Sequence, residues 1–100
     1  MKISKKHLNS LKKLCVEYKV STLAAFGSVL REDFNDTSDI DFAIDFNETD
    51  PIKYANLYFE LKQKLEELFK RKIDLIELRA VKNKFFKEEL DKNKVTIYGL

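Results

Sequence analysis

Several residue types are scarce in this 100-residue chain, and each shortage excludes a class of protein. One cysteine, Cys15, cannot form an internal disulfide, so a disulfide-stapled secreted scaffold is excluded. Two glycines and one proline exclude a collagen-like or linker-like sequence. No apolar run approaches the roughly 18 residues that span a bilayer, and the lysine-studded N-terminal segment lacks the apolar core of a secretory signal. We therefore expect a cytoplasmic protein that does not enter a membrane.

The composition that remains is typical of a small folded domain. Hydrophobic residues make up 44% of the chain and charged residues 36%, which is enough to bury one core beneath a solvated surface. Domains ordinarily contain about 100–200 residues, so we expect a single domain over residues 1–100.

Charge is strongly segregated along the chain, although the net charge is only +2. Residues 1–20 hold six lysines and one acid, whereas residues 31–50 hold eight acids and one arginine. Carboxylates about 6 Å apart repel one another by roughly 2–3 kcal/mol per pair. A bound cation would relieve this repulsion, and a solvated acidic loop is the alternative interpretation. So dense an acidic cluster in mid-chain also argues against a nucleic acid as the partner.

Hydrophobic periodicity predicts alternating helices and strands. Apolar residues at helical spacing predict a helix after Ser4 that runs to about Tyr18 and a second over about 51–70. A last helix is predicted by Val81, Phe85, Phe86 and Leu90, and a short helix is predicted over residues 28–32. Ser4 caps the first helix, and Asp50 precedes a proline at the start of the second. Short apolar runs predict strands over 22–26, 39–46, 73–78 and 95–98. This order predicts an α/β (α+β) fold, with a mixed sheet of about four strands covered by helices.

The strand over 39–46 has the most informative pattern, because apolar and mostly acidic residues alternate along it. The apolar set is Ile40, Phe42, Ile44 and Phe46, and the other set is Asp39, Asp41, Ala43 and Asp45. Asp39 and Asp41 therefore project from the same face, with Cα atoms about 6.5–7 Å apart. Two carboxylates at this spacing can bracket divalent cations, which prefer hard oxygen ligands.

Two further features complete a candidate site. Asp74 lies within an apolar strand pattern, and if that strand lies beside the first, a third carboxylate completes a two-metal site. Gly27 and Ser28 end a strand and open a helix, where free backbone N–H groups can bind a phosphate. Each feature alone also fits a turn, a polar strand face or an edge position. Their conjunction indicates phosphoryl or nucleotidyl transfer.

These motifs resemble those of the DNA polymerase β-like nucleotidyltransferase superfamily. The segments that carry the resemblance are Gly27-Ser28-Val29-Leu30-Arg31, Ser38-Asp39-Ile40-Asp41-Phe42 and Ile73-Asp74-Leu75. So short a chain is similar to the minimal nucleotidyltransferase (MNT) branch, which includes MntA-type antitoxins. The likeness runs from about Leu23 to Glu77 and implies the polymerase β-like nucleotidyltransferase fold.

The resemblance also implies a role for each motif residue. Asp39 and Asp41 would hold two Mg²⁺ ions, and Asp74 would hold the catalytic ion and help activate the acceptor hydroxyl. The β- and γ-phosphates of a nucleoside triphosphate would bind at Gly27 and Ser28. Arg31 would support the phosphates or the acidic cluster, with a surface ion pair as its alternative role. The implied reaction is attack by a hydroxyl on the α-phosphorus of a nucleoside triphosphate, with ATP as the expected substrate, which releases pyrophosphate.

A protein partner follows from the same resemblance. MNT proteins pair with HEPN-domain ribonuclease toxins, and some transfer AMP from ATP to a toxin tyrosine. A chain this short leaves little surface to recognise an acceptor, which favours a protein acceptor and a homo- or hetero-oligomer. One alternative is a non-catalytic antitoxin that blocks its toxin by occlusion, although a pure binder has no use for three mutually repelling carboxylates. The other alternative is nucleotide transfer to a small molecule or an RNA end.

Overall fold

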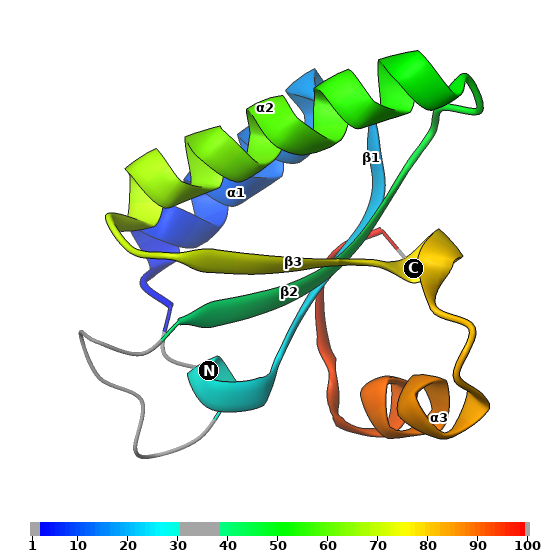
Figure 1. Cartoon of the computed structure of the whole chain (residues 1–100). Coiled ribbons are helices and arrows are strands. Elements are labelled where there is room, and N and C mark those ends of the chain that lie inside the picture. Colours follow the sequence, from blue (N-terminus) through cyan, green and yellow to red (C-terminus); the bar gives the residue numbers. More distant parts are fainter. Residues whose placement is uncertain (1–2, 31–38, 100) are drawn as a thin grey trace.

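The computed structural model of the chain describes residues 3–30 and 39–99 (Figure 1). Its elements are, in order, α1 (Lys5–Glu17), β1 (Val20–Phe26), the 3₁₀ helix η1 (Gly27–Leu30), β2 (Ile40–Phe46), α2 (Pro51–Phe69), β3 (Ile73–Glu77), the 3₁₀ helix η2 (Leu78–Ala80), α3 (Lys84–Asn93) and β4 (Val95–Tyr98). Apart from η2, which was not predicted, this is the predicted order of elements. In the described part, no helix is both long and apolar enough to cross a membrane. The cytoplasmic location stays a prediction.

The four strands of the described residues form one mixed sheet in the order β3-β2-β1-β4. β2 is parallel to β3 and antiparallel to β1, and β4 is antiparallel to β1. Figure 1 shows α1 and α2 together on one side of the sheet, with η1 and α3 on the other. The predicted mixed sheet covered by helices is confirmed.

The alternation in β2 determines which face of the sheet is apolar. Its four apolar residues, Ile40, Phe42, Ile44 and Phe46, are buried in the core, as the pattern predicts. Leu11 and Cys15 of α1 and Leu61 and Leu65 of α2 belong to the same buried cluster. The opposite face carries Asp41 and Asp45, but its middle is covered, because Ala43 and its partner Ala24 are both buried.

Helix boundaries follow the capping residues more closely than the hydrophobic period. The Ser4 and Asp50 side chains accept hydrogen bonds from backbone N–H groups at the starts of α1 and α2, as predicted. The last helix, α3, spans Lys84–Asn93 and contains three of the four apolar residues that predicted it, whereas Val81 precedes it. Its first turn is set by Asn83, whose Oδ1 accepts a hydrogen bond from the Phe86 N–H at 3.0 Å. β1 also begins two residues before its predicted start.

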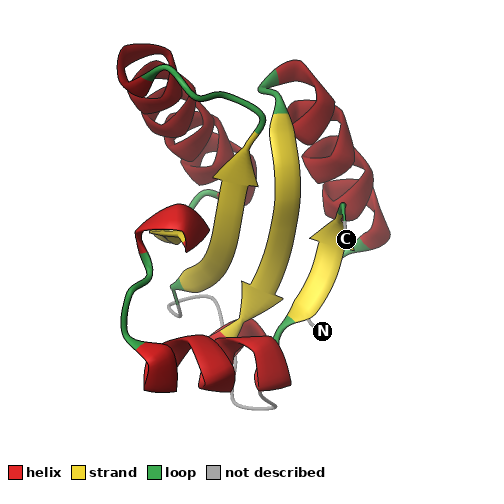
Figure 2. Cartoon of the chain, turned by 90° about the vertical axis from the view of Figure 1, so that its right-hand side faces the viewer, coloured by secondary structure: helices red, strands yellow, loops and turns green. Residues whose placement is uncertain are grey.

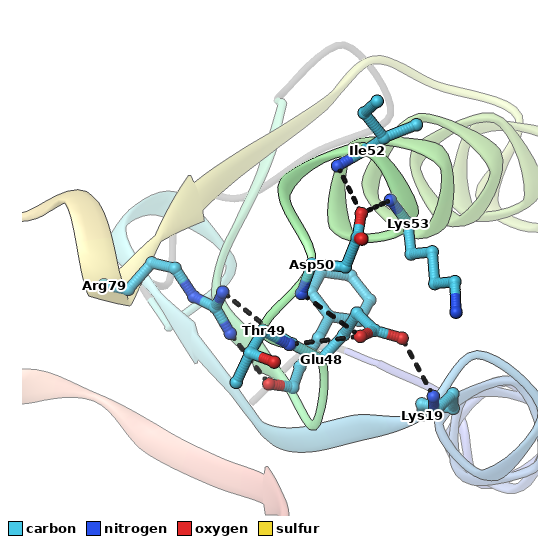
Figure 3. A network of polar contacts seen from close by, with 8 residues as sticks. Lys19, Glu48, Thr49, Asp50, Ile52, Lys53 and Arg79 are labelled. Atoms are coloured by element: carbon cyan, nitrogen blue, oxygen red, sulfur yellow. Dashed lines mark hydrogen bonds and ion pairs between the residues drawn. The ribbon is translucent and has the colours of Figure 1, made fainter.

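A polar network around Arg79 holds the connection between β2 and α2 (Figure 3). Arg79 follows β3 in η2, and its Nε donates to Asp45 Oδ1 at 2.8 Å. Its two Nη atoms donate to the carbonyl oxygens of Phe46 and Glu48, both at 2.9 Å. The guanidinium also lies 4.0 Å from the centre of the Tyr54 ring. One side chain therefore ties the end of β3 to the end of β2 and to α2.

Replacing Arg79 with alanine should lower the free energy of unfolding by about 2 kcal/mol, because the Asp45 carboxylate and two carbonyls lose a charged donor. In a chain of this size such a loss lowers Tm by roughly 10 °C, which thermal unfolding followed by circular dichroism will measure. The matched control is Lys94→Ala, which removes an exposed ion pair with Asp91 and should change stability by less than about 1 kcal/mol. Equal effects of the two substitutions would show that the network adds nothing beyond a surface pair.

Candidate active site

The parallel pairing of β2 with β3 places two of the predicted acidic residues side by side. Asp41 is the register partner of Asp74. Paired residues on adjacent strands lie about 5 Å apart and point to the same face of the sheet. Asp74 is exposed and Asp41 is half-buried, on the face opposite α1 and α2. The requirement that the strand carrying Asp74 lie beside the strand carrying Asp41 is therefore met.

Gly27 lies on the opposite side of Asp41 from Asp74, because β1 and β3 flank β2 in the sheet. Phe26, the last residue of β1, is the register partner of Asp41, and the chain turns into η1 immediately afterwards. Gly27 has a φ of +70°, a conformation that favours glycine. A Cβ on Gly27 would overlap Oδ2 of Asp41 and lie 3.3 Å from its Cγ. The absent side chain thus lets the backbone lie directly against the Asp41 carboxylate.

The pairing of the strands does not fix the positions of the other predicted site residues, Asp39, Ser28 and Arg31. Asp39 lies one residue before β2 and is exposed, so the strand register positions Asp41 and Asp74 but not Asp39. Ser28 follows Gly27 in η1, and Arg31 lies outside the described residues. Among residues 3–30 and 39–99, no group of three or more His, Cys, Asp or Glu residues is arranged to hold a metal ion. The convergence of all three carboxylates stays a prediction.

The adjacent carboxylates nevertheless fit a magnesium ion that arrives with a nucleotide. Mg²⁺ is usually bound by one or two carboxylates together with substrate phosphates and several waters, rather than by a cage made only of protein ligands. Asp41 and Asp74 supply hard oxygen ligands on neighbouring strands. Their mutual repulsion falls when a divalent cation lies between them. A site of this kind needs no preformed group of three protein ligands.

Tyr58 of α2 holds the edge of the sheet beside this pair. Its hydroxyl donates a hydrogen bond to the Leu75 carbonyl oxygen at 2.7 Å, one residue beyond Asp74. Burial raises the pKa of Tyr58, and the negative charges of Glu77 and Asp74 raise it further. The hydroxyl therefore keeps its proton and remains a donor near neutral pH, which stabilises β3 in its place at the edge.

A pocket beside Gly27 was not predicted from the sequence. It has a volume of about 440 Å³ and is lined by Phe26, Gly27, Leu30, Phe86, Glu89, Leu90 and Asn93. It lies between the end of β1, η1 and α3. Figure 2 shows α3 below the strands, on the side away from the two longer helices. The adjacent Phe85 and Phe86 were a usable signal, because neighbouring side chains on a helix point about 100° apart and one of the two rings lies off the apolar stripe.

Comparison with known proteins shows the family to which this fold and site belong. The family described as "Polymerase beta, Nucleotidyltransferase" matches residues 9–99. A Methanocaldococcus jannaschii protein, MJ0126, named as a candidate protein adenylyltransferase, is 37% identical over 95 residues, which cover 95% of this chain and 91% of the relative. The chain therefore belongs to the polymerase beta nucleotidyltransferase family and is a nucleotidyltransferase.

Solved structures with the same fold include toxin-antitoxin complexes. A toxin-antitoxin structure with AMP-PNP is 25% identical, has a TM-score of 0.72, and matches 93% of this chain and 73% of that chain. A tri-AMPylated Shewanella oneidensis HEPN toxin in complex with its MNT antitoxin gives a match with 24% identity and a TM-score of 0.68, over 98% of this chain and 74% of that chain. The predicted MNT resemblance and the fold class are both confirmed.

Proposed function

We propose that this protein is a Mg²⁺-dependent nucleotidyltransferase that transfers AMP from ATP to a hydroxyl of a protein partner. The observation that carries the proposal is the contact between the Gly27 backbone and the Asp41 carboxylate, with Asp74 adjacent to Asp41 on the next strand. A phosphate bound at Gly27 would lie beside the carboxylates that would hold its metal. Membership of a nucleotidyltransferase family supports the assignment of the chemistry.

Each predicted site residue would have its own role in metal binding, phosphate binding or proton transfer. Asp41 and Asp74 would hold Mg²⁺, with Asp39 as a further ligand, and the triphosphate would lie along Gly27 and Ser28 with Arg31 in support. When bound, the two metal ions would neutralise the charge that develops on the phosphates. The acceptor oxygen forms a bond to the α-phosphorus, the bond from that phosphorus to the β-phosphate oxygen breaks, and pyrophosphate leaves. Asp74 would accept the proton of the acceptor hydroxyl.

The proposed partner is a HEPN-domain toxin, with this chain as its antitoxin. Two findings on other proteins support it: a relative is named as a candidate protein adenylyltransferase, and a structural neighbour is an MNT antitoxin in complex with an AMPylated HEPN toxin. Such a pair would form a hetero-oligomer in which the toxin brings its own acceptor surface to the exposed side of Asp74.

The decisive test is to incubate the protein, Mg²⁺ and ATP labelled on its α-phosphate with a co-purifying HEPN-domain partner. Intact-mass spectrometry should show the partner heavier by one or more AMP groups, and peptide mapping should place them on hydroxyl side chains. Chelation with EDTA should stop the transfer. A partner that is neutralised without gaining mass would instead identify a non-catalytic antitoxin, and label found only on a small molecule or an RNA end would overturn the proposed acceptor.

A further inference from the structure

The pocket beside Gly27 has an apolar wall that the described residues, 3–30 and 39–99, leave uncovered. Leu90 is the only residue of α3 that is buried. Phe86, which lines the pocket, is 40% exposed, whereas its neighbour Phe85 is 74% exposed and does not line it. Phe26 and Leu30 form the facing wall. An aromatic ring that remains accessible in a concave site is available to a flat apolar ligand.

Gly27 belongs both to this pocket and to the phosphate position of the proposed active site. A ligand whose anionic end lies at Gly27, with its metal ion held by Asp41, would extend its other end between Phe26 and α3. The pocket volume of about 440 Å³ falls within the range of roughly 300–1,000 Å³ that is usual for small-molecule sites. A nucleoside triphosphate combines these two chemistries, because it has a charged chain and a flat base.

The polar rim of the pocket adds a preference among bases. Glu89 and Asn93 stand one turn apart on α3, and Asn93 Nδ2 lies 3.4 Å from Glu89 Oε2. An ionised carboxylate only accepts hydrogen bonds, so it matches the exocyclic amino group of adenine. The corresponding position of uracil is a carbonyl oxygen, which a carboxylate repels.

We propose that this pocket binds the nucleoside moiety of ATP, with the base stacked on Phe86 and its amino group directed to Glu89. This inference rests on the proposed function and assigns the part of the substrate that the carboxylates do not touch. α3 is then a substrate-binding element, which accounts for the exposure of an aromatic ring that the core does not use.

Phe86→Ala tests the assignment, with Phe85→Ala as the matched control from the same helix. Isothermal titration calorimetry would measure Mg·ATP and inorganic tripolyphosphate on each variant. Loss of one stacked aromatic ring should weaken ATP binding about tenfold or more in Phe86→Ala and leave tripolyphosphate binding unchanged. Phe85→Ala should match the unsubstituted protein for both ligands, and Phe86→Tyr should retain ATP binding.

Three outcomes would overturn the nucleoside pocket. Unchanged ATP binding in Phe86→Ala would remove the stacking role, and equal loss of ATP and tripolyphosphate would show that α3 merely supports the fold. Unchanged ATP binding with weakened binding of the HEPN-domain partner would make the pocket a partner site. AMP transfer by the unsubstituted protein separates these failures from failure of the proposed function.

Glu89→Gln tests the proposed base contact through the binding preference for ATP over UTP. A preference that decreases in Glu89→Gln would support the contact, and an unchanged preference would refute it.

Discussion

Replacing Asp41 with asparagine will slow AMP transfer by about 1,000-fold and leave the chain folded. A catalytic metal contributes several kcal/mol of transition-state stabilisation, and each 1.36 kcal/mol corresponds to a factor of about ten. The amide keeps the size of the side chain that lies against Gly27 but removes its charge. Single-turnover measurement of AMP transfer, at saturating Mg·ATP and partner, gives the rate. Mg·ATP should also raise Tm of the unsubstituted protein and fail to raise it in Asp41→Asn.

Asp91→Asn is the control, because it makes the same chemical change at an exposed position of α3 whose ion pair with Lys94 is on the surface. It should transfer AMP at the unsubstituted rate. Transfer that survives in Asp41→Asn would remove Asp41 from the metal site. Neutralisation of the partner that survives without transfer would mean that inhibition works by occlusion.

Gly27→Ala should reduce AMP transfer about 100-fold and lower the free energy of unfolding by roughly 1–2 kcal/mol. The stability loss follows from the φ of +70°, which an L side chain adopts at a cost. The larger loss of rate follows from the overlap between the new Cβ and Asp41 Oδ2, because either the carboxylate or the start of η1 must move. Rates measured together with chemical denaturation separate the two effects.

Gly99→Ala provides a backbone control for this substitution. Gly99 also has a positive φ, +76°, and a Cβ there would overlap the Ser21 carbonyl oxygen, far along β1 from the site. Gly99→Ala should therefore lose comparable stability while its folded fraction keeps the full rate. If both variants lost activity only in proportion to their stability, the close approach at Gly27 would have no catalytic meaning.

Local signals in the sequence predicted most of the secondary structure. The alternation Ile40 to Phe46 requires only neighbouring residues, and it correctly separated the core face of β2 from the face that carries Asp41. Caps are equally local, so Ser4 and Asp50 marked the starts of α1 and α2. The start of α3 differs from the prediction, because the cap residue Asn83 interrupts the apolar pattern that begins at Val81. The apolar residues of α3 are also mostly exposed, so they mark its ends poorly.

The sequence by itself determined the order of the main elements and the acidic face of β2, and it predicted which residues would bind metal and phosphate. Only the tertiary structure decided which of these residues lie next to one another. Strand order is a matter of long-range hydrogen bonding, so the neighbouring positions of Asp41 and Asp74 depend on the parallel pairing of β2 with β3. The same holds for Gly27 against Asp41, for the contacts of Arg79, and for α3 beside the end of β1. Each joins residues well separated along the chain, and no local period encodes such distances.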